Sequence, residues 1–231
     1  KRADAGLAEL ASAGLPSLAV RVPGHQVSRD LIRAAGVPLA APSANASGQL
    51  SPTTPEHVRQ SLGQNVDMII AGGAADIGLE STVLDLTGEK PVILRPGAIT
   101  AQDLESLLGD VAYAESTDSD APKSPGQTLQ HYAPHTPLRL DAVDVAQDEA
   151  LLAFGSTRFM AMRDGGHAGD LSDSVFRNLS EAGDLLEAAA NLFRHLHALD
   201  RAGRSQIAVM PVPDKGIGRA INDRLRRAVK T

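Results

Sequence analysis

Small hydroxyl and amide side chains are concentrated in residues 42–52, which read PSANASGQLSP. Ser43, Asn45 and Ser51 add short hydrogen-bond donors and acceptors, and Gly48 allows the backbone to come close to a ligand. The apolar residues 37–41 precede this loop and predict a buried strand. A strand that ends in such a loop can present polar groups to a polar ligand; the alternative is an ordinary Ser/Asn/Gly turn.

A cation and a hydroxyl share one face of a second expected strand, at residues 17–22. The alternation of side chains there places Ser17 and Arg21 on the same side. Because a guanidinium matches a carboxylate through two parallel hydrogen bonds, Arg21 is a candidate carboxylate clamp. The alternative is an arginine on a solvent-facing sheet surface.

Three further polar residues stand at the ends of expected strands. Glu80 and Ser81 open an alternating segment at residues 81–86, and Arg95 follows an apolar segment at residues 92–94. Ser81 is either a ligand contact or a strand-edge hydroxyl, and Arg95 is either a ligand contact or a solvated loop residue. Glu80 is either a surface carboxylate or, by the family resemblance given below, a group that orients a catalytic lysine in a segment that this chain is expected to lack.

The elements that would position these residues form two α/β regions joined by a linker. In the first region, capping signals predict helices at 28–35, from 54 onward and at 100–108, and a further strand is expected at 67–71. Residues 109–136 are rich in Ser, Thr, Asp, Pro and Gly, as interdomain linkers are. The second region is expected to alternate strands at 137–140, 159–162 and 207–210 with helices at 147–152, 181–199 and 217–229. This order predicts a small parallel α/β layer.

The composition excludes several kinds of chemistry. The 231 residues include no Cys, which rules out disulfides, thiolate catalysis and Cys-ligated metals and suits a reducing cytoplasm. His195 and His197 fall on different faces of an expected helix, so we expect no protein-ligated metal. The net charge of −6 disfavours direct RNA binding, and no apolar run is long enough to span a membrane. The basic residues near the end, Arg224 among them, are expected to form a solvated helix face.

Taken in order, several motifs resemble the threonylcarbamoyl-AMP synthase family in its two-domain form, which has a YrdC-like catalytic domain. The motifs are LAVRVP at 18–23, the loop at 42–52, GLESTVLD at 78–85, ILRPG at 93–97, SPG at 124–126 and HYAP at 131–134. The resemblance implies an α/β fold: the C-terminal part of a YrdC-like twisted domain at residues 1–109, a linker or lid at 110–136, and a small Rossmann-like parallel domain at 137–231. It also implies that the chain lacks the N-terminal part of the catalytic domain and is inactive alone.

The resemblance further implies a reaction in which L-threonine, bicarbonate and ATP give threonylcarbamoyl-AMP and pyrophosphate. Mg²⁺ would accompany ATP, and the product would pass to cytoplasmic machinery that modifies tRNA. One alternative is a non-catalytic RNA-binding or regulatory YrdC-like module. A related carbamoyl transferase of hydrogenase maturation is a second, but those proteins carry Cys-rich zinc segments and this chain has no Cys.

The family's ligand contacts map onto nine positions, none of which is a nucleophile or a general acid or base. The resemblance assigns ATP to Ser17, Ser43, Asn45, Ser51, Arg95 and Tyr132, and threonine to Arg21, Ala41 and Ser81. The family usually has Thr at position 17, and it more often has basic residues at 127–130. Asn45 is equally well interpreted as a residue that holds its own loop, and Tyr132 as either a lid that covers the nucleotide or a buried anchor of the linker.

Overall fold

The structure, a computed structural model, describes residues 8–12, 14–114, 131–158, 160–168 and 171–229. A three-stranded sheet has the order β1-β2-β3, with β1 (Val83–Asp85) antiparallel and β3 (Ala112–Tyr113) parallel to β2 (Val92–Arg95). Helix α3 (Ala101–Leu108) connects β2 to β3 and covers a small core. Val83, at the start of β1, pairs with Arg95, at the end of β2. This pairing places Arg95 beside the residues that precede β1, among them Ser81.

Local capping chemistry sets the ends of the helices in this part of the chain. Helix α2 (Pro55–Leu62) begins with Pro after Thr54, whose hydroxyl accepts a hydrogen bond from the backbone of His57. Helix α3 begins with a capping box in which Thr100 and Asp103 bond each other's backbone. These helix starts confirm the sequence prediction, and the first helix ends at residue 35 as predicted, before the left-handed Gly36.

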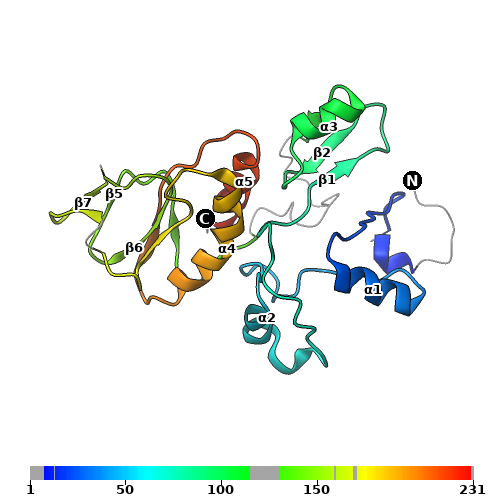
Figure 1. The fold of residues 1–231 in the computed structure, drawn as a ribbon, viewed down its shortest axis with the longest axis horizontal. Helices are drawn as coiled ribbons and strands as arrows, with labels where there is room; N and C mark the ends of the chain where they lie inside the picture. The colour runs from blue at the N-terminus through cyan, green and yellow to red at the C-terminus, as the bar shows by residue number, and fades with distance from the viewer. Residues whose placement is uncertain (1–7, 13, 115–130, 159, 169–170, 230–231) are drawn as a thin grey trace.

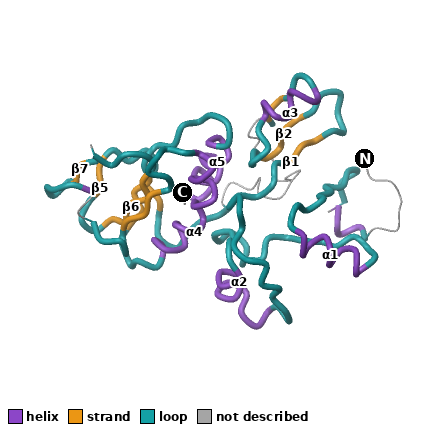
Figure 2. Tube along the Cα trace, viewed as in Figure 1, coloured by secondary structure: helices purple, strands orange, loops and turns teal. Residues whose placement is uncertain are grey.

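The first helix, α1 (Gln26–Ala35), begins two residues before the expected Ser28. Short 3-10 turns lie at η1 (Glu9–Ser12) and η2 (Gly63–Asn65). Apart from α2 and η2, the chain between α1 and β1 is loop (Figure 2).

Three strand predictions are wrong. Residues 17–22, 37–41 and 67–71 are extended or irregular loop, and their apolar side chains are exposed: 86% for Val20, 90% for Val22 and 79% for Met68. The alternating pattern gives a strand only where a neighbouring strand satisfies the backbone, and no described strand pairs with these segments.

The C-terminal region contains a four-stranded parallel sheet in the order β4-β9-β6-β8. Its strands are β4 (Leu138–Arg139), β9 (Gln206–Val209), β6 (Glu149–Ala153) and β8 (Phe176–Asn178). The helices are α4 (Leu185–Asp200) and α5 (Gly218–Ala228), and β5 (Asp144–Val145) pairs with β7 (Ala161–Met162) in a separate ribbon. The α/β fold with a parallel layer is confirmed.

Most of the expected helix at 147–152 is instead β6, one of the two interior strands, whose five residues are all buried. Ala150 and Leu152 pack with α4 and α5, whereas Leu151 and Ala153 pack on the opposite face, under the β5–β7 ribbon. A short apolar run buried on both sides does not reveal its period, so the sequence pattern could not distinguish strand from helix.

Helices α4 and α5 lie between this sheet and the rest of the chain. Beyond them lie α2 and the β1–β2–α3 unit, and α1 is farther away still (Figure 1). Leu50 and Tyr132 belong to the same buried cluster as the two helices, and Leu79 and Ala98 pack against it. The division of the chain at residues 109 and 136 stays a prediction. In the part of the chain that the structure describes, no helix has the length and apolar character needed to cross a bilayer.

Candidate functional site

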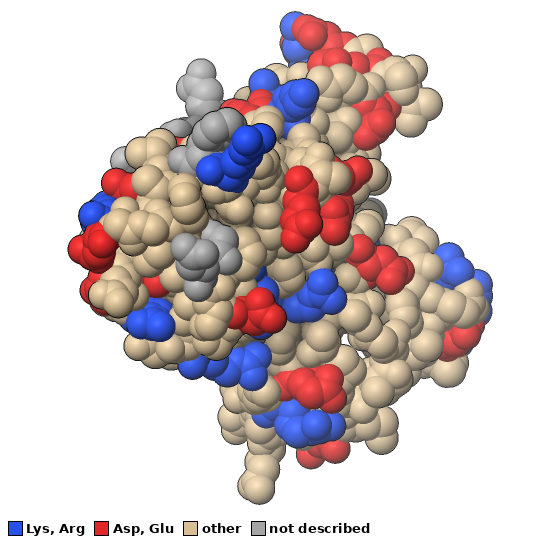
Figure 3. Space-filling view, turned by 60° about the vertical axis from the view of Figure 1, so that its left-hand side comes forward, with Lys and Arg blue, Asp and Glu red and all other residues tan. Residues whose placement is uncertain are grey.

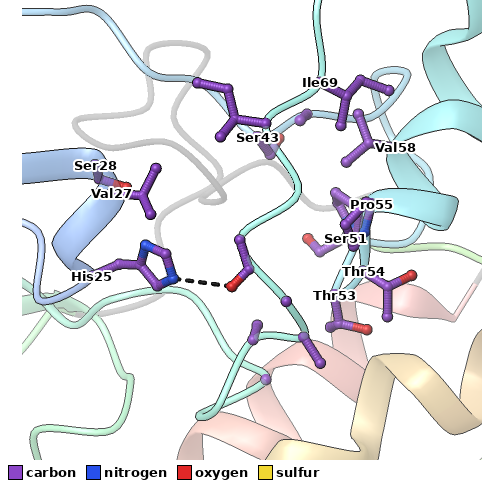
Figure 4. Close-up of a pocket in the computed structure, with 18 of the residues that line it drawn as sticks. His25, Val27, Ser28, Ser43, Ser51, Thr53, Thr54, Pro55, Val58 and Ile69 are labelled. Carbon is purple, nitrogen blue, oxygen red and sulfur yellow. Dashed lines mark hydrogen bonds between the residues drawn. The ribbon is translucent and has the colours of Figure 1, made fainter. Parts of the chain in front are cut away.

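A cavity of about 510 Å³ lies between α1, the start of α2 and the loop at residues 69–80. One wall carries the hydroxyls of Ser51, Thr53 and Thr54, and His25, Val27 and Ser28 face it from the other side, with Ser43 between the two sides at the top of the view (Figure 4). The loop at residues 42–52 therefore forms part of a pocket, as expected for a ligand-presenting loop.

The lining of this pocket combines hydroxyls with apolar side chains. Val27 and Leu31 of α1 and Val58 of α2 supply apolar surface, and His25 lies with its Nε2 3.1 Å from the carbonyl oxygen of Gly72. Among the described residues that line the pocket there is no Lys or Arg, and Glu80 is the acidic one. Such a lining suits a ligand with an apolar portion and several hydrogen-bonding groups.

The loop that carries Ser43 and Ser51 is held by its own side chains. Asn45 Nδ2 donates to the carbonyls of Ala46 and Gln49 at 3.0 and 3.1 Å, and Ser61 Oγ of α2 accepts from the Ala46 backbone at 2.8 Å. Asn45 is absent from the pocket lining. These bonds favour the interpretation of Asn45 as a loop-holding residue, and its contact with ATP stays a prediction.

A charged network lies behind the hydroxyl wall. Ser51 Oγ donates a hydrogen bond to Glu80 Oε1, and Arg224 Nε donates to Glu80 Oε2 at 2.8 Å. Burial alone would raise the pKa of Glu80, but the charge and hydrogen bond of Arg224, together with the bond from Ser51, hold it below its usual value. Glu80 is therefore a half-buried carboxylate held by an ion pair, not the surface carboxylate of the first alternative.

Arg224 corrects a second sequence interpretation. Its side chain is fully buried instead of lying on a solvated face, and it sits 5.3 Å from the ring centroid of Tyr132. The missed signal is its position on α5, because Arg224 lies three residues after Ile221 and directly before Leu225, both of which are buried. It therefore shares the apolar face of its helix.

Tyr132 and Arg95 complete this network. Tyr132 is 1% exposed with a left-handed φ of 64°, and its side chain hydrogen-bonds Arg95, whose Nε and Nη2 also donate to the carbonyl of Ser81 at 3.1 and 2.9 Å. Burial raises the pKa of Tyr132 and lowers that of Arg95. The ring packs against Phe193 of α4, at 5.6 Å between centroids, so the geometry favours a buried anchor over a movable lid.

Two histidines from different parts of the chain stack beside Ser51. The rings of His57 on α2 and His197 on α4 have centroids 3.9 Å apart, and His197 Nε2 lies 3.1 Å from the carbonyl of Ser51, to which it donates. Burial, followed by the charges of His197 and Arg201, lowers the pKa of His57 from 6.5 to about 4. The pair is therefore neutral at physiological pH, and it packs α2 against α4.

The structure brings five of the nine predicted ligand residues to two adjoining places. Ser43 and Ser51 line the pocket, and Ser81, Arg95 and Tyr132 meet in the network around Glu80 and Arg224. Like Asn45, the other three predicted ligand residues do not line the pocket. Ser17, Arg21 and Ala41 lie in loops, and Arg21 and Ala41 are exposed. Their roles stay predictions.

The expected linker is described only at its end. Residues 115–130, including the SPG motif and residues 127–130, lie outside the described residues. The following segment packs against the candidate loop, because the Ala133 backbone donates to the carbonyl of Gly48 at 2.9 Å and Ala133 pairs with Gln49. The HYAP motif therefore contacts the Ser43–Ser51 loop through its backbone.

Comparison with known proteins matches both parts of the chain. Residues 1–97 match the family described as "Telomere recombination", and residues 99–229 match "Threonylcarbamoyl-AMP synthase, C-terminal domain". The chain is 36% identical over 222 residues to the threonylcarbamoyl-AMP synthase of Bacillus subtilis (strain 168) and 37% identical over 226 residues to that of Pyrococcus abyssi (strain GE5 / Orsay). These alignments cover 94% and 93% of the chain and 64% of each relative, so the chain spans just under two thirds of their length.

The fold is similar to a solved structure as well. The crystal structure of P. abyssi Sua5 complexed with L-threonine superposes with a TM-score of 0.82 at 31% sequence identity. The match covers 96% of this chain and 66% of that one.

Proposed function

The chain belongs to the threonylcarbamoyl-AMP synthase family, and from this premise we propose that it serves the formation of L-threonylcarbamoyladenylate from L-threonine, bicarbonate and ATP. The relatives from B. subtilis and P. abyssi carry this enzyme name, and the similar solved structure contains L-threonine. The observation that supports the proposal most directly is the pocket, because Ser43 and Ser51 of the loop expected to present a ligand both line it.

The proposed reaction asks the protein for positioning more than for covalent chemistry. The threonine amine condenses with bicarbonate, releasing water, to give a carbamate. A carbamate oxygen then bonds to the α-phosphorus of ATP while the bond to the pyrophosphate oxygen breaks. The protein can accelerate this step by holding the two reactants in line and by stabilising the negative charge that develops in the transition state. A pocket lined by hydroxyls, with Arg95 and Arg224 in the adjoining network and no Cys in the chain, fits this task.

The residues of the pocket would divide the work by chemistry. The apolar surface of Val27, Leu31 and Ile69 suits a purine face or the threonine methyl group, and the hydroxyls of Ser43 and Thr54 suit polar groups of either ligand. Mg²⁺ would enter with ATP as part of the substrate. Glu80 has both carboxylate oxygens engaged, by Ser51 and Arg224, so the described lining leaves coordination of this ion to the phosphates and water.

We propose that the product passes to the machinery that makes threonylcarbamoyladenosine in tRNA, which places the reaction in the cytoplasm. RNA binding by the chain itself is the rival function. The face drawn in Figure 3 mixes Lys and Arg with Asp and Glu and displays no broad basic patch, and the net charge is −6. An RNA-binding module would lose affinity steeply as salt rises, whereas binding of threonine would change little.

Pyrophosphate release tests the proposed function. It is measured on the 231-residue chain and on the longest protein that its gene encodes, with L-threonine and bicarbonate omitted in turn. Release that requires both in the longer protein supports the proposal, and the sequence predicts that the 231-residue chain alone gives none. Release that continues without threonine, or no release from either protein with all substrates present, would contradict it.

A further inference from the structure

The buried Arg224 side chain connects the two matched parts of the chain. Its Nε donates to Glu80 and its Nη2 to the carbonyl of Pro96 at 3.0 Å, partners that lie 144 and 128 positions away in the sequence. Its Nη1 donates to Asp223 at 2.5 Å, so each nitrogen of the guanidinium has a partner. A buried cation with all its nitrogens engaged holds its partners in a fixed arrangement.

Glu80 passes this constraint to the pocket. Oε2 of its carboxylate is bonded to Arg224, and Oε1 accepts the hydrogen bond from Ser51. Ser51 and Glu80 both line the pocket, and the side chain of Glu80 is 18% exposed. Arg224 keeps Glu80 ionised, and an ionised carboxylate can only accept hydrogen bonds.

The hydroxyl of Ser51 has a single proton, and that proton is given to Glu80. What Ser51 can still offer a ligand is therefore the lone pairs of Oγ. A ligand group next to it must donate an O–H or N–H. A phosphate oxygen there would face the lone pairs of Oγ and the negative charge of Glu80, both of which repel it.

We infer that Arg224 is a positioning residue that, through Glu80, fixes Ser51 as a hydrogen-bond acceptor toward the pocket. Ser51 then selects a donor group of the ligand: a ribose hydroxyl of the nucleotide, or the ammonium or hydroxyl of L-threonine. This narrows the role that family resemblance gives to Ser51, because a contact with a phosphate is excluded. The inference rests on the proposed function for the identity of the ligands.

Binding measurements with matched ligands test the polarity of Ser51. Calorimetric titration of the protein that releases pyrophosphate would use ATP, 2′-deoxy-ATP, 3′-deoxy-ATP, L-threonine and inorganic triphosphate. If Ser51 accepts from a ribose hydroxyl, the parent binds one deoxynucleotide about two- to tenfold more weakly than ATP, the range for one neutral hydrogen bond, and Ser51→Ala loses that preference. If it accepts from threonine, Ser51→Ala instead weakens threonine binding by a similar factor and leaves nucleotide preference unchanged.

Inorganic triphosphate supplies the opposing outcome. Its binding should be unchanged or tighter in Ser51→Ala. Triphosphate and ATP weakened to the same extent would mean that Ser51 donates to phosphate, which overturns the inference. The control is Ser106→Ala, which removes an exposed hydroxyl of α3 bonded to the carbonyl of Asp103 and should leave each affinity unchanged.

The relay through Glu80 is tested by removing both charges together. In the double variant Glu80→Gln/Arg224→Met neither charge is left buried alone, and the amide of Gln can donate to Ser51 and release its O–H toward the pocket. In this variant the ratio of ATP affinity to deoxynucleotide affinity, or the loss of threonine affinity caused by Ser51→Ala, should fall below about twofold. Inorganic triphosphate should bind severalfold more tightly than it binds the parent. Unchanged preferences in a folded double variant would overturn the relay.

Two further outcomes are separated by design. Should circular dichroism show that the double variant does not fold, Arg224→Lys replaces it, because one ammonium cannot hold both Glu80 and Pro96 in the same geometry; unchanged preferences then overturn the relay. Failure of every form to bind ATP or threonine would overturn the proposed function and this inference with it. ATP binding with a phosphate contact at Ser51 would overturn the inference alone.

Discussion

Gly78 packs against helix α4, and adding a single methyl group there should disturb the contact between the pocket and the C-terminal region. It lies two residues before Glu80 with a left-handed φ of 73°, and a Cβ there would stand 2.5 Å from the carbonyl oxygen of Ala189 and 2.6 Å from Cα of Ala190. Both contacts are with the backbone of α4, which cannot rotate away as a side chain can. Gly78→Ala must therefore displace the loop or the helix.

The expected size follows from two separate costs. A left-handed backbone costs an alanine about 1–2 kcal/mol. Forcing a methyl group into packed backbone adds about 1–3 kcal/mol. Gly36→Ala isolates the first cost, because Gly36 is left-handed with a φ of 66° and a ψ of 8°, and a Cβ there would meet nothing within 4 Å. The difference between the two variants is then about 1–3 kcal/mol of unfolding free energy, assigned to the contact with α4.

Thermal unfolding followed by circular dichroism measures this difference. For a chain of this size each kcal/mol lowers Tm by about 2–4 °C, so Gly78→Ala should melt roughly 2–12 °C below Gly36→Ala. Because the displaced loop carries Glu80, the affinity of Gly78→Ala for ATP or threonine should also fall, whereas Gly36→Ala should bind as the parent does. Equal melting temperatures in the two variants would refute the close contact between Gly78 and α4.

Four other perturbations give separate tests. Arg224→Met should cost about 3–5 kcal/mol by leaving Glu80 buried without its cation, and adding Glu80→Gln should recover most of the loss; equal losses in chemical denaturation would contradict this. The pKa of His57 is lowered to about 4 in the folded chain, so its contribution to stability is complete above pH 6.5 and is lost as the pH falls toward 4. His57→Gln should make the free energy of unfolding depend less steeply on pH between about 4 and 6.5. The pH dependence that is left should come in part from His195, whose pKa is also lowered to about 4. A slope equal to that of the parent would rule out the stacked histidine pair as a cause of the pH dependence. Arg21→Lys should weaken threonine more than ATP if Arg21 is the carboxylate clamp, and equal losses would make it structural. Tyr132→Ala should lower the free energy of unfolding by about 3–5 kcal/mol. If Tyr132 is a lid over the nucleotide, the variant should also consume ATP without retaining the adenylate. If the variant retains the adenylate as well as the parent does, Tyr132 is only a buried anchor.

Local signals in the sequence predicted the helices best. The starts of α2 and α3 depend on Thr54, Pro55 and the Thr100/Asp103 pair, groups that act within one turn of the chain. The strand predicted at 17–22 is absent from the structure, because alternation gives a sheet only when another segment pairs with it.

The candidate site shows the same limit in its charges. The spacing of Arg224 with Ile221 and Leu225 indicates that it is buried, but nothing near it in the sequence identifies its partners Glu80 and Pro96, which are more than a hundred positions away. Ser43 and Ser51 were found because loop chemistry is local. Their partners became visible only once the fold placed α5 behind the loop.

The position of the Ser43–Ser51 loop is set from three directions, and only one of them is local. Asn45 ties the loop to itself, the Ala133 backbone bonds Gly48 at 2.9 Å, and His197 bonds the carbonyl of Ser51 at 3.1 Å. The last two partners lie within residues 99–229, in the second matched region. A change in the C-terminal region therefore reaches the pocket through hydrogen bonds to its loop, without any ligand contact of its own. For this reason, variants of α4 or α5 should alter ligand affinity together with stability.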